Sequence, residues 1–167
     1  DGLTSVGRTS VNIGPGFMNA FKLVGSTYTL LNPFGSHQNA IATAASADGT
    51  LVVGFSIDGS ANNQAVSWTG STATLLDVNG AFQYSEATGV SSAGTTIVGW
   101  GFSTVDPNLQ REEAFYVRGG NLTNFNVLFN AYASKASGVS ADGNTIVGSL
   151  TDSFSTPSML SGVIYTV

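Results

Sequence analysis

An internal repeat of 45 to 49 residues limits what this chain can fold into more than any other feature. Asp48-Gly49 directly precedes the apolar run TLVVGFS, and Asp142-Gly143 precedes NTIVGSL. Ala93-Gly94 before TTIVGWG and Asp1-Gly2 before LTSVGRT complete the series. Two more blocks recur in the same order: NAFKLVGSTYTLL (19–31), QAVSWTGSTATLL (64–76), EAFYVRGGNLTNF (113–125) and SGVIYTV (161–167), then IATAASADG (41–49), EATGVSSAG (86–94) and KASGVSADG (135–143). Such an ordered recurrence indicates an array built from one supersecondary unit.

Each unit is predicted to contain four short strands and no helix. In the second unit the strands are expected at about 50–56, 64–69, 72–78 and 86–92. An Asp-Gly pair between apolar runs favours a type I′ hairpin turn, in which both central residues have positive φ. Ala93-Gly94 lacks the aspartate, so a different or looser turn is expected there.

The first strand of each unit is apolar on both faces. Val52 and Val53 are neighbours in sequence and therefore point to opposite sides of the sheet, which predicts burial on both sides. Gly54 follows them in the same repeated position and is expected to allow a neighbouring sheet or backbone to approach closely. Ala65 beside Trp68 in the second strand suits interlocking packing between sheets, with Trp68 in the core.

The predicted fold class is all-β, a propeller-like array of about four repeats, each a four-stranded antiparallel unit. A β-solenoid or a β-sandwich built from stacked hairpins is the alternative. The chain is treated as one repeat domain, 1–167, with repeats at about 1–47, 48–92, 93–141 and 142–167, the last incomplete. It amounts to four repeats less two strands. Open edge strands invite pairing, so a homo-oligomer or polymer is a predicted assembly.

Composition excludes several classes of function. The 167 residues are 42% hydrophobic and only 9% charged, which argues against disorder along the whole length. Five basic residues against ten acidic ones exclude an electrostatic nucleic-acid interface. No apolar run reaches the roughly 20 residues that span a bilayer. Because the chain has no cysteine, disulfides and thiolate metal sites are excluded.

The segment ASGVSADGNTIVG (136–148), together with the A-[FV]-x-[WV]-x-G pattern that follows its counterparts as AVSWTG (65–70) and AFYVRG (114–119), resembles the HAF-type extracellular repeat family. The resemblance runs through residues 1–7, 40–70, 86–119 and 135–148, although the Gly-Asp-Leu-Pro-Gly-Gly-like connector of that family is missing. It implies a bacterial protein that is secreted or attached to the cell surface. It implies no particular activity, because the family has no well-defined shared one.

Catalytic and metal sites are weakly supported by the sequence. His37, the single histidine, lies beside Ser36 in the segment PFGSHQN and is interpreted as a loop residue exposed to water. The Asp-Gly turns lack the acidic ligand pattern of calcium loops and are interpreted as turn chemistry. Glu112 and Glu113 are consecutive and face opposite ways in a strand. With Asp106 and Arg111 they lie in the longest connector, 103–113, so a solvated loop with a local ion pair is preferred over a catalytic pair. No cofactor and no metal site are predicted.

Aromatic residues give the remaining candidate site. Trp100 occupies a position that varies between repeats, where Phe55 and Ser149 are its counterparts, and Tyr84 and Tyr132 lie near repeat junctions. Aromatic faces stack on the apolar face of sugar rings, so Trp100, Tyr84 and Tyr132 are the predicted sugar-binding residues.

These observations favour a non-catalytic extracellular or cell-surface module with a structural, adhesive or self-assembling role. The alternative is a lectin-like β-propeller with glycans as ligands, and an enzyme such as a glycosidase ranks third. Neither a nucleic-acid partner nor a membrane span is predicted.

Overall fold

The structure is a computed structural model that describes residues 3–10, 18–77, 79–104, 111–129, 131–151 and 161–167. Across these residues the chain forms strands and one short helix, α1 (Phe125–Phe129), which the sequence did not predict. The strands are β1 (Thr4–Thr9), β2 (Asn19–Val24), β3 (Thr27–Leu31), β4 (Asn39–Ala45), β5 (Leu51–Ile57), β6 (Asn63–Thr69), β7 (Thr72–Leu75), β8 (Phe82–Val90), β9 (Thr96–Ser103), β10 (Glu112–Arg118), β11 (Asn121–Asn124), β12 (Ala133–Val139), β13 (Thr145–Thr151) and β14 (Ser161–Thr166).

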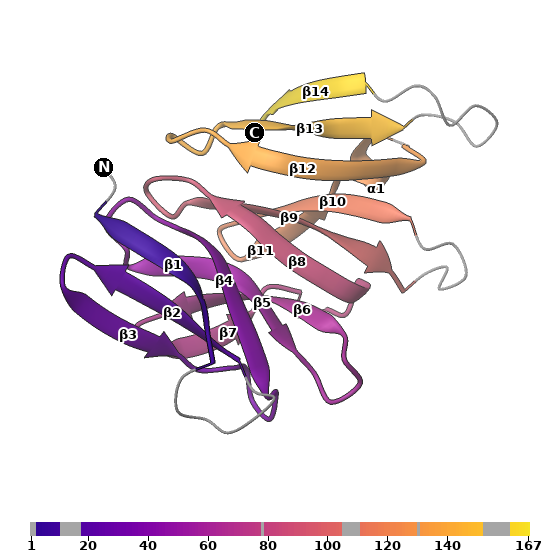
Figure 1. Ribbon diagram of the computed structural model, residues 1–167. Coiled ribbons are helices and arrows are strands. Elements are labelled where there is room, and N and C mark those ends of the chain that lie inside the picture. Colours follow the sequence, from indigo (N-terminus) through magenta and orange to yellow (C-terminus); the bar gives the residue numbers. More distant parts are fainter. Residues whose placement is uncertain (1–2, 11–17, 78, 105–110, 130, 152–160) are drawn as a thin grey trace.

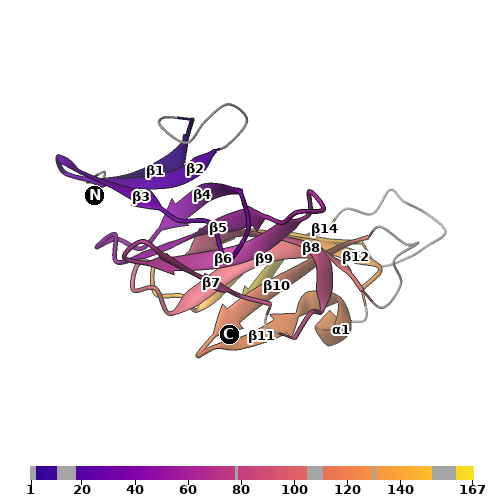
Figure 2. The same ribbon diagram turned by 90° about the horizontal axis from the view of Figure 1, so that it is seen from below.

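The strands form four separate antiparallel sheets, each a meander in chain order: β1-β2-β3, β4-β5-β6-β7, β8-β9-β10-β11 and β12-β13-β14. Figure 1 shows the first sheet at the lower left, the last at the top, and the other two between them. Figure 2 views the same arrangement from below, with α1 beside β11. Neighbouring sheets in the chain pack on one another. Among the described elements, no extensive contact joins the first sheet to the fourth, so they form an open array.

Sheets and sequence repeats are offset by one strand. The repeat 48–92 contains β5 to β8, whereas the sheet consists of β4 to β7. The Ser-x-x-Gly turns therefore connect the first two strands within a sheet, and the connectors near residues 32–38 and 76–81 lead from one sheet to the next. The strands predicted for the second unit are confirmed within a few residues, except that β8 extends back to Phe82 and that residue 78 lies outside the described part.

The repeated turns are not type I′, which corrects the prediction. Gly49 has a φ of 67°, but Asp48 does not have a positive φ. The Gly49 N–H donates to the carbonyl of Ser46 at 2.9 Å, as in a type I turn followed by a left-handed glycine. Gly94 makes the same bond to Ser91 at 2.9 Å, so alanine at position 93 leaves the turn unchanged. The turn at Asp1-Gly2 lies outside the described residues.

Serine and aspartate side chains close these turns. The Ser46 hydroxyl accepts from the Leu51 N–H at 3.0 Å and donates to Asp48 at 2.7 Å. Asp48 also accepts from the backbone and the hydroxyl of Thr50, at 3.0 and 2.8 Å. These bonds support the interpretation of the Asp-Gly pairs as turn chemistry.

Asp48 is expected to titrate at low pH. The Thr50 N–H, then the Ser46 and Thr50 hydroxyls, stabilise its carboxylate and lower its pKa from the ordinary 3.8 to about 2. A lowered pKa adds stability above pH 3.8 that is lost as the pH falls toward 2. Carbon NMR of the carboxyl groups should show this titration midpoint. Asp48→Asn should flatten the pH dependence of the unfolding free energy in this window, and an Asp48 midpoint near 3.8 would contradict the prediction.

Successive sheets are connected by backbone hydrogen bonds between their turns. The N–H of Ala47 donates to the carbonyl of Ser92 at 3.0 Å, and the N–H of Ser92 donates to the carbonyl of Ala141 at 3.0 Å. The Thr96 hydroxyl adds a bond to the Gly143 carbonyl at 2.9 Å. The three turns therefore form a ladder that fixes the spacing of the second, third and fourth sheets.

Each sheet has a forward face, turned toward the next sheet in the chain, and a backward face, turned toward the preceding one. In β5, Val52 lies in the backward core with Val66 and Trp68, and Val53 lies in the forward core with Phe115. Both valines are fully buried, which confirms the prediction that this strand is covered on both sides. The last sheet departs from it: Val147, the counterpart of Val53, is 42% exposed.

A β-bulge in the first strand of the second, third and fourth sheets explains the repeated glycine. Gly54 pairs with Ala42, and the register shifts at Thr43, which is the extra residue. A Cβ on Gly54 would lie 2.0 Å from the carbonyl oxygen of Ile41. The predicted close approach is confirmed, and the neighbour is the adjacent strand of the same sheet. Gly99 and Gly148 face the bulges of β8 and β12 in the same way.

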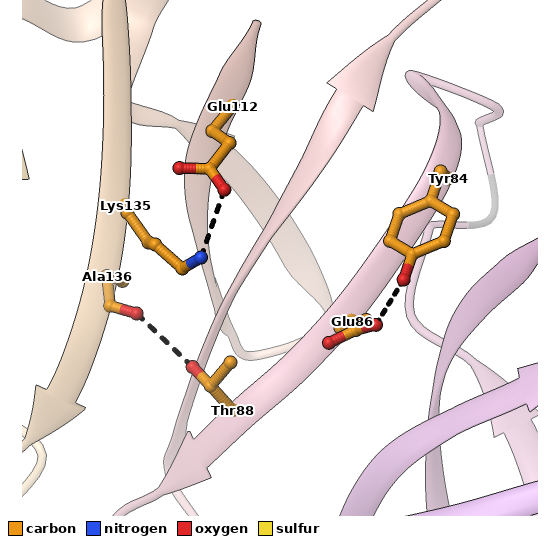
Figure 3. A network of polar contacts seen from close by, with 6 residues as sticks. All are labelled: Tyr84, Glu86, Thr88, Glu112, Lys135 and Ala136. Carbon is orange, nitrogen blue, oxygen red and sulfur yellow. Dashed lines mark hydrogen bonds and ion pairs between the residues drawn. The ribbon is translucent and has the colours of Figure 1, made fainter. Parts of the chain in front are cut away.

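The bulge residue also reaches the next sheet. The Thr43 hydroxyl lies 2.7 Å from the carbonyl oxygen of Ala87 in β8 and 3.1 Å from that of Val53. Thr88 repeats the arrangement. Its hydroxyl lies 3.3 Å from the carbonyl oxygen of Ala136 (Figure 3) and 3.4 Å from that of Val98.

Removing this hydroxyl should loosen the sheet contacts in a graded way. Thr43→Val is expected to cost about 1 kcal/mol, because a carbonyl between two sheets loses its donor. Thr88→Val should cost less, since its bonds are longer. The matched control is Ser137→Ala, at the equivalent position of the last sheet, beyond which the described residues form no further sheet that could accept its hydrogen bond. Urea unfolding of the three variants measures the order, and an equal loss in Ser137→Ala would contradict it.

Candidate functional site

Two of the three predicted aromatic residues come together. Tyr84 on β8 and Trp100 on β9 have ring centroids 5.5 Å apart, and Phe102 lies 5.5 Å from Tyr84 and 5.6 Å from Trp100. The antiparallel register produces this cluster, because Tyr84 pairs with Phe102 and Glu86 pairs with Trp100. All three rings are half-buried on the forward side of the third sheet.

Polar groups adjoin the ring of Tyr84. Its hydroxyl donates to the carboxylate of Glu86 (Figure 3). The side-chain amide of Asn63 on β6 donates to the Tyr84 hydroxyl oxygen and to Oε1 of Glu86, each at 2.6 Å. Burial, followed by the hydrogen bond and charge of Glu86, raises the pKa of Tyr84 above its ordinary value of 10.0. Tyr84 therefore remains a protonated donor at neutral pH. This network ties the second sheet to the third.

Lys135, on β12 of the fourth sheet, lies over the ring of Trp100. Its Nζ lies 4.3 Å from the centroid of the Trp100 ring and 3.0 Å from Glu112 (Figure 3). The two charged side chains are 42% and 40% exposed, so the ion pair is screened by water and adds little stability. The ammonium group nevertheless occupies part of the tryptophan face and joins the third sheet to the fourth.

Tyr132 has a different partner. The guanidinium carbon of Arg111 lies 4.7 Å from the centroid of its ring. The backbone N–H of Tyr132 donates to the carbonyl of Thr151 at 2.8 Å, and this bond anchors the segment before β12. Trp68 is fully buried, as predicted, and its indole N–H donates to the Asn32 carbonyl at 2.7 Å.

His37 is engaged rather than exposed, which corrects the sequence interpretation. Its Nδ1 lies 3.0 Å from the hydroxyl of Ser56, not of Ser36. Ser56 is fully buried, accepts from the Phe34 N–H at 3.0 Å and donates to the Asn39 carbonyl at 3.2 Å. These contacts anchor the connector between the first two sheets. A buried hydroxyl held by backbone groups is not a presented nucleophile.

The two consecutive glutamates lie at the start of β10, not in a loop, and neither forms an ion pair with Arg111. Asp106, the third acidic residue of the predicted loop, lies outside the described residues. Glu112 pairs with Lys135, and Glu113 accepts from the Asn124 amide at 2.6 Å. Their side chains have separate partners on opposite faces of the strand. Residues 105–110 of the same connector lie outside the described part.

Large exposed apolar side chains lie on the two end sheets and on α1, where Val127 is 82% and Leu128 is 46% exposed. On the backward face of the first sheet, Tyr28 is 51% and Leu30 is 38% exposed, and the Tyr28 ring stacks on Phe21 with centroids 5.5 Å apart. On the forward face of the last sheet, Val147 pairs with Ile164, which is 75% exposed. Sequence reasoning missed these surfaces, although the repeat alignment of Val147 with Val53 contained the signal.

Comparison with known proteins adds to the fold. No family model matches the chain, and neither does any curated protein. A structure of TolB from Acinetobacter baumannii has a TM-score of 0.60 at 14% identity, covering 96% of this chain and 37% of that one. A structure assigned as TolB from Agrobacterium tumefaciens has a TM-score of 0.58 at 13% identity, covering 89% of this chain and 54% of that one.

The fold is β-propeller-like. The chain spans only about a third to a half of the length of these two proteins, and at such identity the likeness concerns the fold alone. The prediction of an all-β, propeller-like array of antiparallel sheets is confirmed at this level, without a closed ring among the described residues.

The described residues include neither a metal-binding cluster nor a membrane-spanning helix. They contain no group of three or more histidine, aspartate or glutamate side chains placed to hold a metal ion. Within the same ranges, no helix has the length and apolar character needed to cross a membrane.

Proposed function

We propose that the chain is a non-catalytic structural or adhesive module that associates through the exposed faces of its end sheets. One observation carries the proposal: Val147 is 42% exposed, while its counterparts Val53 and Val98 in the interior sheets are fully buried. Valine at this position packs between two sheets in the second and third sheets, so the same residue on the last sheet suits packing against a further sheet. Val147 adjoins Ile164, which is 75% exposed, and contiguous exposed apolar side chains mark interaction surfaces.

An extracellular or cell-surface location is part of the proposal. The resemblance of residues 136–148 to HAF-type repeats supports it, and so does a surface rich in uncharged polar residues, with only 9% charged residues in the chain. The non-catalytic role is supported by the engagement of the obvious reactive groups. His37 contacts a buried serine, and Glu112 and Glu113 each bind a separate partner.

Self-association of the purified chain tests this function. Static light scattering across rising protein concentration should show a mass above that of the 17.1 kDa chain, and electron microscopy should show the assemblies. A monomer throughout, at concentrations up to the solubility limit, would contradict self-assembly.

Carbohydrate binding is the second candidate, favoured by the half-buried Tyr84, Trp100 and Phe102 rings beside the polar groups of Glu86 and Asn63. Such a combination suits the apolar and hydroxyl faces of a sugar. A glycan array should identify a ligand, and Trp100→Ala should abolish its binding. The absence of any binder on a broad array would remove this candidate.

A further inference from the structure

We propose that the forward face of the last sheet in one copy packs on the backward face of the first sheet in a second copy. This inference rests on the proposed function and names its partner and its geometry. The surfaces are the Val147–Ile164 pair at one end and Phe21, Leu23, Tyr28 and Leu30 at the other.

The internal interfaces provide the template. Three times along the chain, the forward face of one sheet packs on the backward face of the next. Between the second and third sheets, for example, forward Val53 meets backward Phe115 and Val117 in one buried core. Between the third and fourth sheets, forward Val98 meets backward Ile146. In these three interfaces, the described cores join a forward face to a backward face.

The backward face of the first sheet fits this template by position. Phe21 pairs with Gly7 as Val66 pairs with Gly54 and Phe115 with Gly99. Val66 and Phe115 are both fully buried under a preceding sheet. In the first sheet no preceding sheet is described, and Tyr28 and Leu30 beside Phe21 remain exposed.

The forward face of the last sheet is the surface that could cover the backward face of the first sheet in another copy. Val147 occupies the position of Val53 and Val98, and Ile164 lies opposite it in the register of β13 and β14. The described residues therefore leave one forward face and one backward face uncovered. Because the two faces differ, their contact is head-to-tail, and such contacts form rings or filaments rather than two-fold dimers.

The contact between copies should be weaker than the internal ones. Inside the chain, turn-to-turn hydrogen bonds such as Ala47 to Ser92 reinforce the packing. The described part of the first sheet begins at β1, so it offers no counterpart of the strand and turn that supply these acceptors. Association would depend mainly on apolar burial and should increase with salt rather than decrease.

The experiment uses one charged substitution on each face. Ile164→Lys blocks the forward face and Tyr28→Lys blocks the backward face, both at sites exposed enough to leave the monomer folded. The matched control is Val127→Lys, because Val127 is 82% exposed on α1, away from both faces. Circular dichroism checks that each variant folds, and sedimentation velocity measures association.

We expect each face variant alone to need at least tenfold higher concentration for association, while Val127→Lys behaves as the unmodified chain. An equimolar mixture of Ile164→Lys and Tyr28→Lys should form heterodimers, because each variant retains the face that the other has lost. Growth beyond the dimer should stop, since the remaining two faces are both blocked.

Other outcomes overturn the pairing. If only one of the two face variants loses association, the contact joins like faces. In that case association through the end sheets stands while this inference falls. If neither variant loses association, the copies meet elsewhere, so self-association stands but its location on the end sheets falls together with this inference. If the unmodified chain never associates, the inference and the self-assembling role fail together.

Discussion

Gly54→Ala is expected to destabilise the protein by about 3 kcal/mol, at the upper end of the usual cost of adding a methyl group to a packed interior. The new Cβ would lie 2.0 Å from the Ile41 carbonyl oxygen and 3.0 Å from the Ala42 Cα. Both are backbone atoms of the paired strand, so no side chain can rotate away. Relief requires separating β4 from β5 at the bulge, which should lower the thermal midpoint and the urea midpoint.

Gly59→Ala is the matched control for this prediction. Gly59 lies in the loop between β5 and β6, has no positive φ, and an added Cβ would meet nothing within 4 Å. The same chemical change should therefore leave stability within about 1 kcal/mol of the original or raise it slightly. Equal midpoints for the two variants would refute the bulge explanation.

Trp68→Ala should cost about 3–5 kcal/mol, the range for deleting a large buried aromatic side chain. Trp68 is fully buried between the first two sheets, in a core with Val52, Ala20 and Leu31. The substitution also leaves the Asn32 carbonyl without its indole donor. Equilibrium unfolding in urea, followed by circular dichroism, measures the loss.

Two controls separate the causes of this effect. Trp68→Phe keeps most of the buried ring and removes the hydrogen bond to Asn32, so it should cost less, about 1–2 kcal/mol. Trp100→Ala removes the same kind of side chain from a half-buried position and should also cost clearly less. A Trp100→Ala loss as large as that of Trp68→Ala would mean that the aromatic cluster, not the core, holds the sheets together.

Strand positions were predictable from sequence because the repeat shows the same apolar alternation several times. The extent of β5 and the burial of Val52 and Val53 follow from two adjacent apolar positions with opposite directions. The sequence did not show which four consecutive strands form one sheet, because a strand can pair with either of its chain neighbours and the repeat has no fixed starting point. The turn type was also missed, because the Ser46 hydroxyl and the type I geometry are set by contacts beyond the Asp-Gly pair.

The candidate site was predictable only in part. Trp100 and Tyr84 were singled out, and their contact depends on a register that the bulge at Thr88 shifts by one residue. Lys135 was not singled out, since nothing near it in sequence indicates a tryptophan in the preceding sheet. Tyr132 was grouped with the other two by its place in the repeat, whereas Arg111 is the partner of its ring.

The one-strand offset between repeat and sheet has a consequence for how such a chain can change over evolution. A duplicated segment such as 48–92 would carry the last three strands of one sheet and the first strand of the next. Each new copy would therefore share one sheet with the repeat before it and another with the repeat after it. Loss of the same segment would close the gap equally well, because the strand it removes is replaced by its homologue. The array can therefore lengthen or shorten by whole units without leaving a half-built sheet at the junction.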